Sequence, residues 1–123
     1  MPYAYEVPLH RPPVGNAAAD LSGKQFYCVK MTSSGVNLSG DTEAILGVLQ
    51  NKPESGKPCE VETLGTTRAV AGAAITKGAN IASGTGGKIR AATTGDYISG
   101  IALEAAAADG DIIPITLRPL GKI

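Results

Sequence analysis

From Gly23 onward, the apolar residues fall in short runs rich in β-forming types, and each run ends at a cluster of glycine, serine, asparagine or proline. Runs punctuated in this way predict short strands joined by turns. We expect strands at residues 26–31, 36–38, 45–49, 59–64, 67–70, 81–82, 88–91, 97–103 and 112–117. Residues 83–87 are expected to form a hairpin-type loop, and residues 109–111 a final turn. Residues 105–108 are all alanine and predict at most one helical turn. The class is mainly β.

Two stretches of the chain resemble each other at a separation of 53 to 54 positions. The first reads Ile-Leu-Gly-Val-Leu-Gln at 45–50, then Gly56, then Cys-Glu-Val-Glu at 59–62. The second reads Ile-Ser-Gly-Ile-Ala-Leu at 98–103, then Gly110, then Ile-Pro-Ile-Thr at 113–116, and a Gly-Asp pair precedes each stretch, at 40–41 and 95–96. We interpret them as two copies of a strand–loop–strand unit, the alternative being chance similarity between glycine-punctuated hairpins. Two such units predict a small single-domain β-sandwich or partly open barrel.

Residues 1–20 differ in composition from the rest of the chain, because they hold four of the eight prolines and two of the four tyrosines. Proline removes backbone donors and drives the preceding residue toward extended conformations. We therefore expect an extended N-terminal arm over residues 1–20 and a β-rich domain over residues 21–123. Within the arm, apolar side chains occupy every second position, at Tyr3, Tyr5, Val7 and Leu9. They would lie exposed in water if the arm were free, so we predict that it grips a neighbouring molecule. A disordered tail and an edge strand of its own domain are the alternatives.

The amino-acid composition limits the kinds of molecule that the chain is expected to bind. The chain has 123 residues, which is enough for one domain, and its 11 Lys+Arg balance its 11 Asp+Glu. This balance gives no electrostatic reason to bind nucleic acid or an acidic membrane. No stretch approaches the roughly 20 apolar residues of a membrane span, and the first residues lack the basic and apolar regions of a secretory signal. Cys28 and Cys59 are expected to be buried thiols of a protein made in the cytoplasm, with a disulfide as the alternative.

The glycine-rich loop and the single histidine do not form a nucleotide or catalytic site. At residues 83–87 the spacing of a phosphate-binding P-loop fails, because Lys88 is followed by Ile89 in place of serine or threonine. The histidine, His10, lies in the proline-rich arm, where it cannot serve as a rigidly positioned base for a serine or cysteine nucleophile.

The acidic residues give no better candidate for a catalytic or metal-binding site. Glu60 and Glu62 share one face of a strand, and we expect that face to be solvated. The Asp-Gly-Asp of residues 109–111 lacks the other ligands of a calcium loop. We therefore predict no enzyme activity, no catalytic residues, no cofactor and no metal.

A more specific signal lies in the second half of the chain. The sequence Gly-Ile-Ala-Leu-Glu-Ala-Ala from Gly100, followed by Asp-Gly-Asp-Ile-Ile-Pro-Ile-Thr-Leu from Asp109, resembles the head-decoration, or capsid cement, proteins of tailed bacteriophages. Ile-Thr-Lys-Gly-Ala-Asn-Ile from Ile75 and Gly-Gly-Lys-Ile from Gly86 add to the resemblance. It covers residues 70–117 closely and residues 23–65 loosely, and it leaves out the arm. It implies a structural virion protein without catalytic residues, which binds the outer surface of an assembled capsid, often as a trimer, and reinforces the shell across subunit joints.

The expected partners are therefore the major capsid protein and other copies of this chain in a homotrimer, without nucleic acid or membrane. We expect the protein to be made in the host cytoplasm and to reside on the capsid surface of the virion. The arm supplies the expected capsid-contact residues, which are Tyr3, Tyr5, Val7, Leu9 and Arg11. One alternative is a small ligand- or glycan-binding β module that uses the loop at 83–87. Another is an enzyme that uses Cys28 or Cys59 with lysine or glutamate partners.

Overall fold

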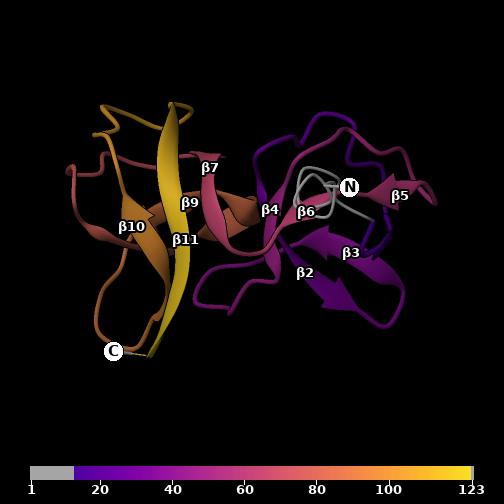
Figure 1. Cartoon of the computed structure of the whole chain (residues 1–123), viewed down its shortest axis with the longest axis horizontal. Coiled ribbons are helices and arrows are strands. Elements are labelled where there is room, and N and C mark those ends of the chain that lie inside the picture. Colours follow the sequence, from indigo (N-terminus) through magenta and orange to yellow (C-terminus); the bar gives the residue numbers. More distant parts are fainter. Residues whose placement is uncertain (1–12, 123) are drawn as a thin grey trace, which may run out of the picture.

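The computed structural model describes residues 13–122, and almost all of its regular structure is strand (Figure 1). In chain order the elements are β1 (Gly15–Asn16), β2 (Cys28–Thr32), β3 (Gly35–Leu38), β4 (Gly47–Leu49), β5 (Pro58–Cys59), β6 (Val61–Glu62), β7 (Gly65–Val70), β8 (Asn80–Ser83), the short 3₁₀ helix η2 (Thr85–Gly87), β9 (Ile89–Ala91), β10 (Tyr97–Ala102) and β11 (Ile112–Lys122). The prediction of a mainly β domain is confirmed.

The strands form three antiparallel sheets, and those of the described residues do not close into a barrel. The C-terminal sheet has five strands in the order β7-β11-β10-β8-β9. The N-terminal sheet has four strands in the order β3-β2-β4-β6, and β1 pairs with β5 in a small third sheet. Figure 1 shows the two larger sheets side by side, with β4 and β6 on the side of the N-terminal sheet that faces β7.

The N-terminal sheet buries apolar side chains on both of its faces. Because side chains alternate along a strand, consecutive residues point to opposite sides. Cys28 and Val48 join a core that they share with the C-terminal sheet. The next residues along each strand, Val29 and Leu49, join a second core with Ala17 and other residues of the N-terminal half. The segment that follows β1 therefore covers one face of this sheet, while the C-terminal sheet covers the other.

Hydrogen bonds between buried serines link the two large sheets. The hydroxyls of Ser39 and Ser83 lie 2.7 Å apart, and both residues are almost fully buried. Ser83 Oγ also donates to the carbonyl oxygen of Gly40 at 2.8 Å. The backbone N–H of Thr42 donates in turn to the carbonyl oxygen of Ser83. Because these polar groups are satisfied inside the protein, they fix the relative position of the sheets and do not weaken the core.

The two predicted strand–loop–strand units appear as two antiparallel pairs, β4 with β6 and β10 with β11. Each pair has a glycine at the same place in the unit. A Cβ at Gly47 would overlap the carbonyl oxygen of Glu62, and a Cβ at Gly100 would overlap that of Thr116. Both glycines are therefore required by the close approach of the partner strand. The hairpin predicted around residues 83–87 is also present, as β8 and β9 joined through η2.

Two local expectations were wrong. Residues 105–108 form no helical turn, because Ala106 is held in an antiparallel bridge to Ile75 instead. The strand expected to begin at Phe26 begins two residues later, at Cys28. Phe26 has a φ of 72°, and its N–H donates to Leu49 while its carbonyl accepts from Val70. This unusual backbone conformation lets one residue join the ends of β4 and β7.

The predicted arm begins in residues outside the described range, and the described part of it includes β1. Gly15 pairs with Cys59 and Asn16 with Pro58, and Ala17 is 4% exposed. The division of the chain into an arm over residues 1–20 and a domain over residues 21–123 stays a prediction.

We predict that Gly100→Ala lowers the free energy of unfolding by about 3 kcal/mol, because the added methyl group must displace the backbone of β11. Gly23→Ala is the matched control, since a Cβ there has no atom within 4 Å. We expect it to change stability by no more than about 0.5 kcal/mol. Urea denaturation followed by circular dichroism measures both. Equal unfolding midpoints for Gly100→Ala and the native chain would contradict the proposed close approach.

Candidate functional site

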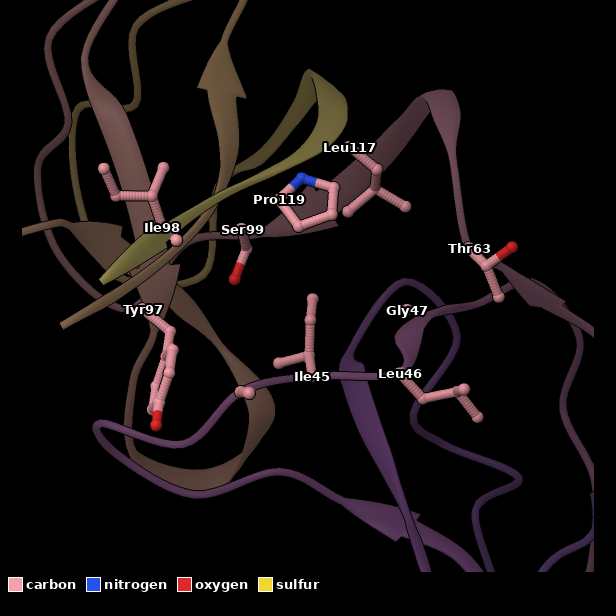
Figure 2. Close-up of a pocket in the computed structure, with 11 residues that line it drawn as sticks. Ile45, Leu46, Gly47, Thr63, Tyr97, Ile98, Ser99, Leu117 and Pro119 are labelled. Atoms are coloured by element: carbon pink, nitrogen blue, oxygen red, sulfur yellow. The ribbon is translucent and has the colours of Figure 1, made fainter. Parts of the chain in front are cut away.

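An apolar groove of about 140 Å³ opens where the two large sheets meet, and we call it the junction groove (Figure 2). It is lined by Ala44, Ile45, Leu46, Gly47, Thr63, Tyr97, Ile98, Ser99, Leu117, Pro119 and Gly121. Figure 2 shows Ile45 and Leu46 on one side, with Tyr97, Ile98 and Pro119 from the C-terminal sheet across from them.

The junction groove is lined by equivalent positions of the two strand–loop–strand units. When Gly47 is aligned with Gly100 and Glu62 with Thr116, four pairs of lining residues correspond: Ala44 with Tyr97, Ile45 with Ile98, Leu46 with Ser99, and Thr63 with Leu117. The glycines let each pair of strands approach closely, and the segments just before them, 44–46 and 97–99, both line the groove. The groove is therefore shared between the two similar units.

Large apolar side chains lie exposed at the rim of the groove and beside it in sequence. Tyr97 is 41% exposed, Leu64, next to the lining residue Thr63, is 63% exposed, and Leu120, between Pro119 and Gly121, is 48% exposed. An exposed aromatic side chain in an apolar groove, as at Tyr97, is typical of a binding site for another apolar surface. Apart from the tyrosine, the lining side chains offer only the hydroxyls of Thr63 and Ser99 as polar groups. The groove is suited to holding an apolar side chain and carries no acid–base chemistry.

A second, wider hollow of about 590 Å³ lies beside the glycine-rich loop. Its cationic side chains are engaged within the protein. Lys88 Nζ lies 2.8 Å from Asp109 Oδ1, and this contact raises the pKa of Lys88. Lys24 Nζ lies 4.9 Å from the centre of the Tyr27 ring. Because these charges are already partnered, the hollow offers an anionic ligand less attraction than its lysines alone indicate.

Arg90, which also lines the second hollow, joins the two aspartates of the repeated Gly-Asp pairs. Its guanidinium donates to both oxygens of Asp96, at 2.6 and 2.9 Å, and Nε donates to Asp41 Oδ1 at 2.8 Å. Asp96 is 2% exposed and also accepts from the backbone N–H and the hydroxyl of Thr93. The Arg90 hydrogen bonds, followed by those from Thr93, hold the pKa of Asp96 well below its usual range. This cluster stabilises the fold, and we assign it no chemistry.

The structure tests some of the residues singled out from the sequence. The predicted contact residues Tyr3, Tyr5, Val7, Leu9 and Arg11 lie outside the described residues, so that prediction stays a prediction. The groove was not predicted, because its walls come from four separate segments whose only common signal is their place in the two units.

The other residues considered as candidates, two cysteines and two glutamates, lie in surroundings that indicate no catalytic role. Cys28 and Cys59 are free thiols with no exposed surface, and burial raises the pKa of Cys28 to about 12. Glu62 was expected to face solvent, and this was wrong. It is 8% exposed because β6 pairs with β4 where the two large sheets meet. Glu60 is exposed, as expected.

Within residues 13–122, no three histidine, cysteine or acidic side chains gather in a way that could hold a metal ion. No helix in the same range is long and apolar enough to cross a membrane.

Comparison with known proteins gives two findings. Residues 14–117 match a family described as phage cement protein. The fold is similar to the crystal structure of the N base of head fiber gp8.5 in bacteriophage phi29, with a TM-score of 0.72 and 16% sequence identity, over 88% of this chain and 92% of that chain. At that identity the similarity concerns the fold alone. No curated protein matches the sequence.

We predict that Asp96→Asn removes part of the acid sensitivity of the fold and lowers the midpoint of thermal unfolding by several degrees at pH 7. A folded-state pKa below the unfolded value of about 3.9 stabilises the protein above that pH. In the native chain this stabilisation is lost as the pH falls through about 4 and below. Calorimetry between pH 2 and pH 7 measures the effect.

The control is Asp109→Asn, which removes a carboxylate whose side chain is 63% exposed. We expect it to leave the midpoint nearly unchanged, since exposed ion pairs contribute little. Identical acid profiles for the native chain and Asp96→Asn would contradict the assigned role of Asp96.

Proposed function

The chain belongs to the phage cement protein family, and from this premise we propose that it binds the outer surface of an assembled phage capsid and stabilises the shell across the joints between capsid subunits. The family match over residues 14–117 is the observation that carries the proposal. Membership of this family makes the protein a capsid-associated structural protein and a component of the virion. The fold it shares with a head fiber base is compatible with this role.

The physical basis of the proposed activity is buried contact area. A protein that binds where two or three subunits meet favours the shell geometry in which its site is complete, because binding shifts the shell toward the state that it prefers. Such binding needs no turnover, and we propose that the protein is not an enzyme. The exposed apolar residues around the junction groove supply surface of the required kind.

We propose that the N-terminal arm supplies the strongest contacts to the capsid, through Tyr3, Tyr5, Val7, Leu9 and Arg11. Tyrosine gives a large contact area with few rotatable bonds, and tyrosine and arginine are common where single residues dominate binding. The prolines restrict the free arm, so less conformational entropy is lost on binding.

We further propose that three copies act together. Three linked weak contacts bind far more tightly than one, because each bound copy raises the effective concentration of the others at their sites. Cyclic arrangements of identical chains are common, and a trimer matches the local threefold relations of an icosahedral shell. In this proposal the partners are the major capsid protein and two further copies of the chain, made in the host cytoplasm, and the complex requires no nucleic acid, membrane or cofactor.

We predict that Tyr5→Ala weakens binding to expanded, undecorated capsids about 30-fold, since a central tyrosine anchor contributes on the order of 2 kcal/mol. Deletion of residues 2–12 should weaken binding at least about 100-fold, because it removes several anchors together. Sedimentation of capsids with increasing amounts of protein measures both affinities.

Glu6→Gln is the matched control, because residue 6 lies on the opposite face of an extended arm from the tyrosines. It should bind like the native chain. Undiminished binding after deletion would exclude the arm as the anchor. Absence of any co-sedimentation, together with binding to a sugar array, would favour the glycan-binding alternative at the loop of residues 83–87.

A further inference from the structure

We propose that the solvent-facing side of β7, β10 and β11 is a contact surface for the capsid, and that it binds a capsid-protein surface that presents carboxylates beside apolar side chains. We call this side of the C-terminal sheet the outer face. The proposal deepens the capsid-binding role given above and rests on it. It places a contact on the domain itself, in addition to the arm.

The strand β11 separates the two sides of this sheet, because side chains alternate along it. It runs between β7 and β10 (Figure 1). Every second residue of its first part belongs to the core between the two large sheets: Ile113, Ile115 and Leu117. The residues that alternate with them, Ile112, Pro114 and Thr116, therefore lie on the outer face.

The register of the neighbouring strands shows which residues join them there. On β7, Arg68 is opposite Pro114, and on β10, Ile101 is opposite Thr116. The N–H of Leu103 donates to the carbonyl oxygen of Pro114 at 3.0 Å, so Leu103 continues the register just past the end of β10. Residues directly opposite each other in a sheet share a face. The outer face thus gathers apolar side chains from two neighbouring strands around Pro114.

These apolar side chains are open to solvent. Ile112 is 53% exposed and Leu103 is 37% exposed. Ile101 and Pro114, which lie next to them, are half-buried. An apolar cluster of this kind on the surface of a sheet is typical of a site that another protein covers.

Two arginines flank the apolar cluster. Arg68 lies beside Pro114, and Arg118 lies four residues further along β11, about 13 Å away along the strand. Leu117 and Pro119 both line the junction groove, so Arg118 between them points to the outer face. Both arginines are exposed, and neither takes part in an ion pair of the described residues.

The charge of this face is one-sided, although the chain as a whole is balanced. The sequences of β7, β10 and β11 contain no aspartate or glutamate. The acidic residues directly before β10 and β11 are engaged within the protein, since Asp96 is bonded to Arg90 and Asp111 accepts two backbone N–H bonds. Glu104, which follows Leu103, is exposed at one edge of the face.

This charge selects the partner. Guanidinium groups form strong, directional hydrogen bonds with carboxylates, so a complementary surface carries acidic side chains around an apolar centre. A second copy that packed its own outer face against this one would bring the arginines of both copies together. Like charges in contact oppose such an arrangement. The observations therefore favour the capsid protein over another copy of this chain.

The size of the face fits one contact among several. From Ile112 to Arg118, β11 is roughly 23 Å long, and three strands about 4.8 Å apart give a surface of roughly 300 Å². A stable interface buries about 800 Å² on each partner. The outer face alone would therefore bind weakly, and its contribution adds to those of the arm and of further copies.

Reversal of both charges tests the proposal. We expect the double variant Arg68→Glu with Arg118→Glu to bind expanded, undecorated capsids at least about 10-fold more weakly, because carboxylates of the partner then meet carboxylates. The matched control is Lys52→Glu with Lys57→Glu, which changes the net charge equally at exposed lysines between β4 and β5. It should weaken binding by less than about threefold. Sedimentation measures both affinities, and circular dichroism checks that both variants are folded.

Hydroxyl-radical footprinting of the native chain gives a second measurement that depends on no variant. We expect Leu103 and Ile112 to lose most of their reactivity when the protein is bound to capsids. Met31, which is 49% exposed on β2 of the other sheet, should keep its reactivity.

The outcomes separate this contact from the capsid-binding role. If the native chain binds, but the arginine variant binds equally well, or both double variants lose equally, or Leu103 and Ile112 stay reactive, the outer face is not the contact. If the native chain does not bind capsids at all, the capsid-binding role fails and this contact fails with it. Analytical ultracentrifugation without capsids should give the same mass for the arginine variant and the native chain. A lower mass for the variant would assign the face to a contact between copies and overturn the proposal.

Discussion

The fold depends on the burial of the N-terminal sheet on both of its faces. β2 and β4 place Cys28 and Val48 in one core and Val29 and Leu49 in the other, all with no exposed surface. Neither face can stay in water without a large loss of hydrophobic stabilisation, so each needs a cover. The C-terminal sheet covers one face, and the segment after β1 contributes to the cover of the other. This requirement fixes the place of β1, which pairs with β5 beside that second core.

Repetition of one unit explains the junction groove better than any single residue does. Both units place a glycine against a carbonyl of the partner strand, and both are preceded by an aspartate that binds Arg90. The two units differ at corresponding positions that line the groove. Leu46 corresponds to Ser99, and Thr63 to Leu117, so in each pair one unit has a large side chain where the other has a smaller one.

Much of the architecture was predictable because alternation and glycine turns are local signals. The two units and the hairpin at β8 and β9 could be predicted for that reason. Features that depend on tertiary contacts could not. Glu62 has the sequence pattern of a solvated strand residue, but it is buried where the two large sheets meet. Ala106 prefers a helix, but it forms an antiparallel bridge with Ile75. The groove was missed for the same reason, since the segments that line it are far apart in sequence.

The balance of charge indicates how such a protein can bind without a net charge that attracts its partner. Lys30, Lys88 and Arg90 are all paired with acidic side chains of the same chain, and the formal net charge is +0. Long-range attraction to a partner is therefore weak, and we expect apolar contact to supply much of the affinity. Apolar contact yields net affinity only when the surfaces lose little freedom on meeting. The buried Ser39–Ser83 pair and the Arg90 cluster supply that rigidity, because the serine pair links the two large sheets and Arg90 joins the two aspartates that precede the units. The hydrogen-bonded polar groups inside the domain thus keep its exposed apolar surface in a fixed shape.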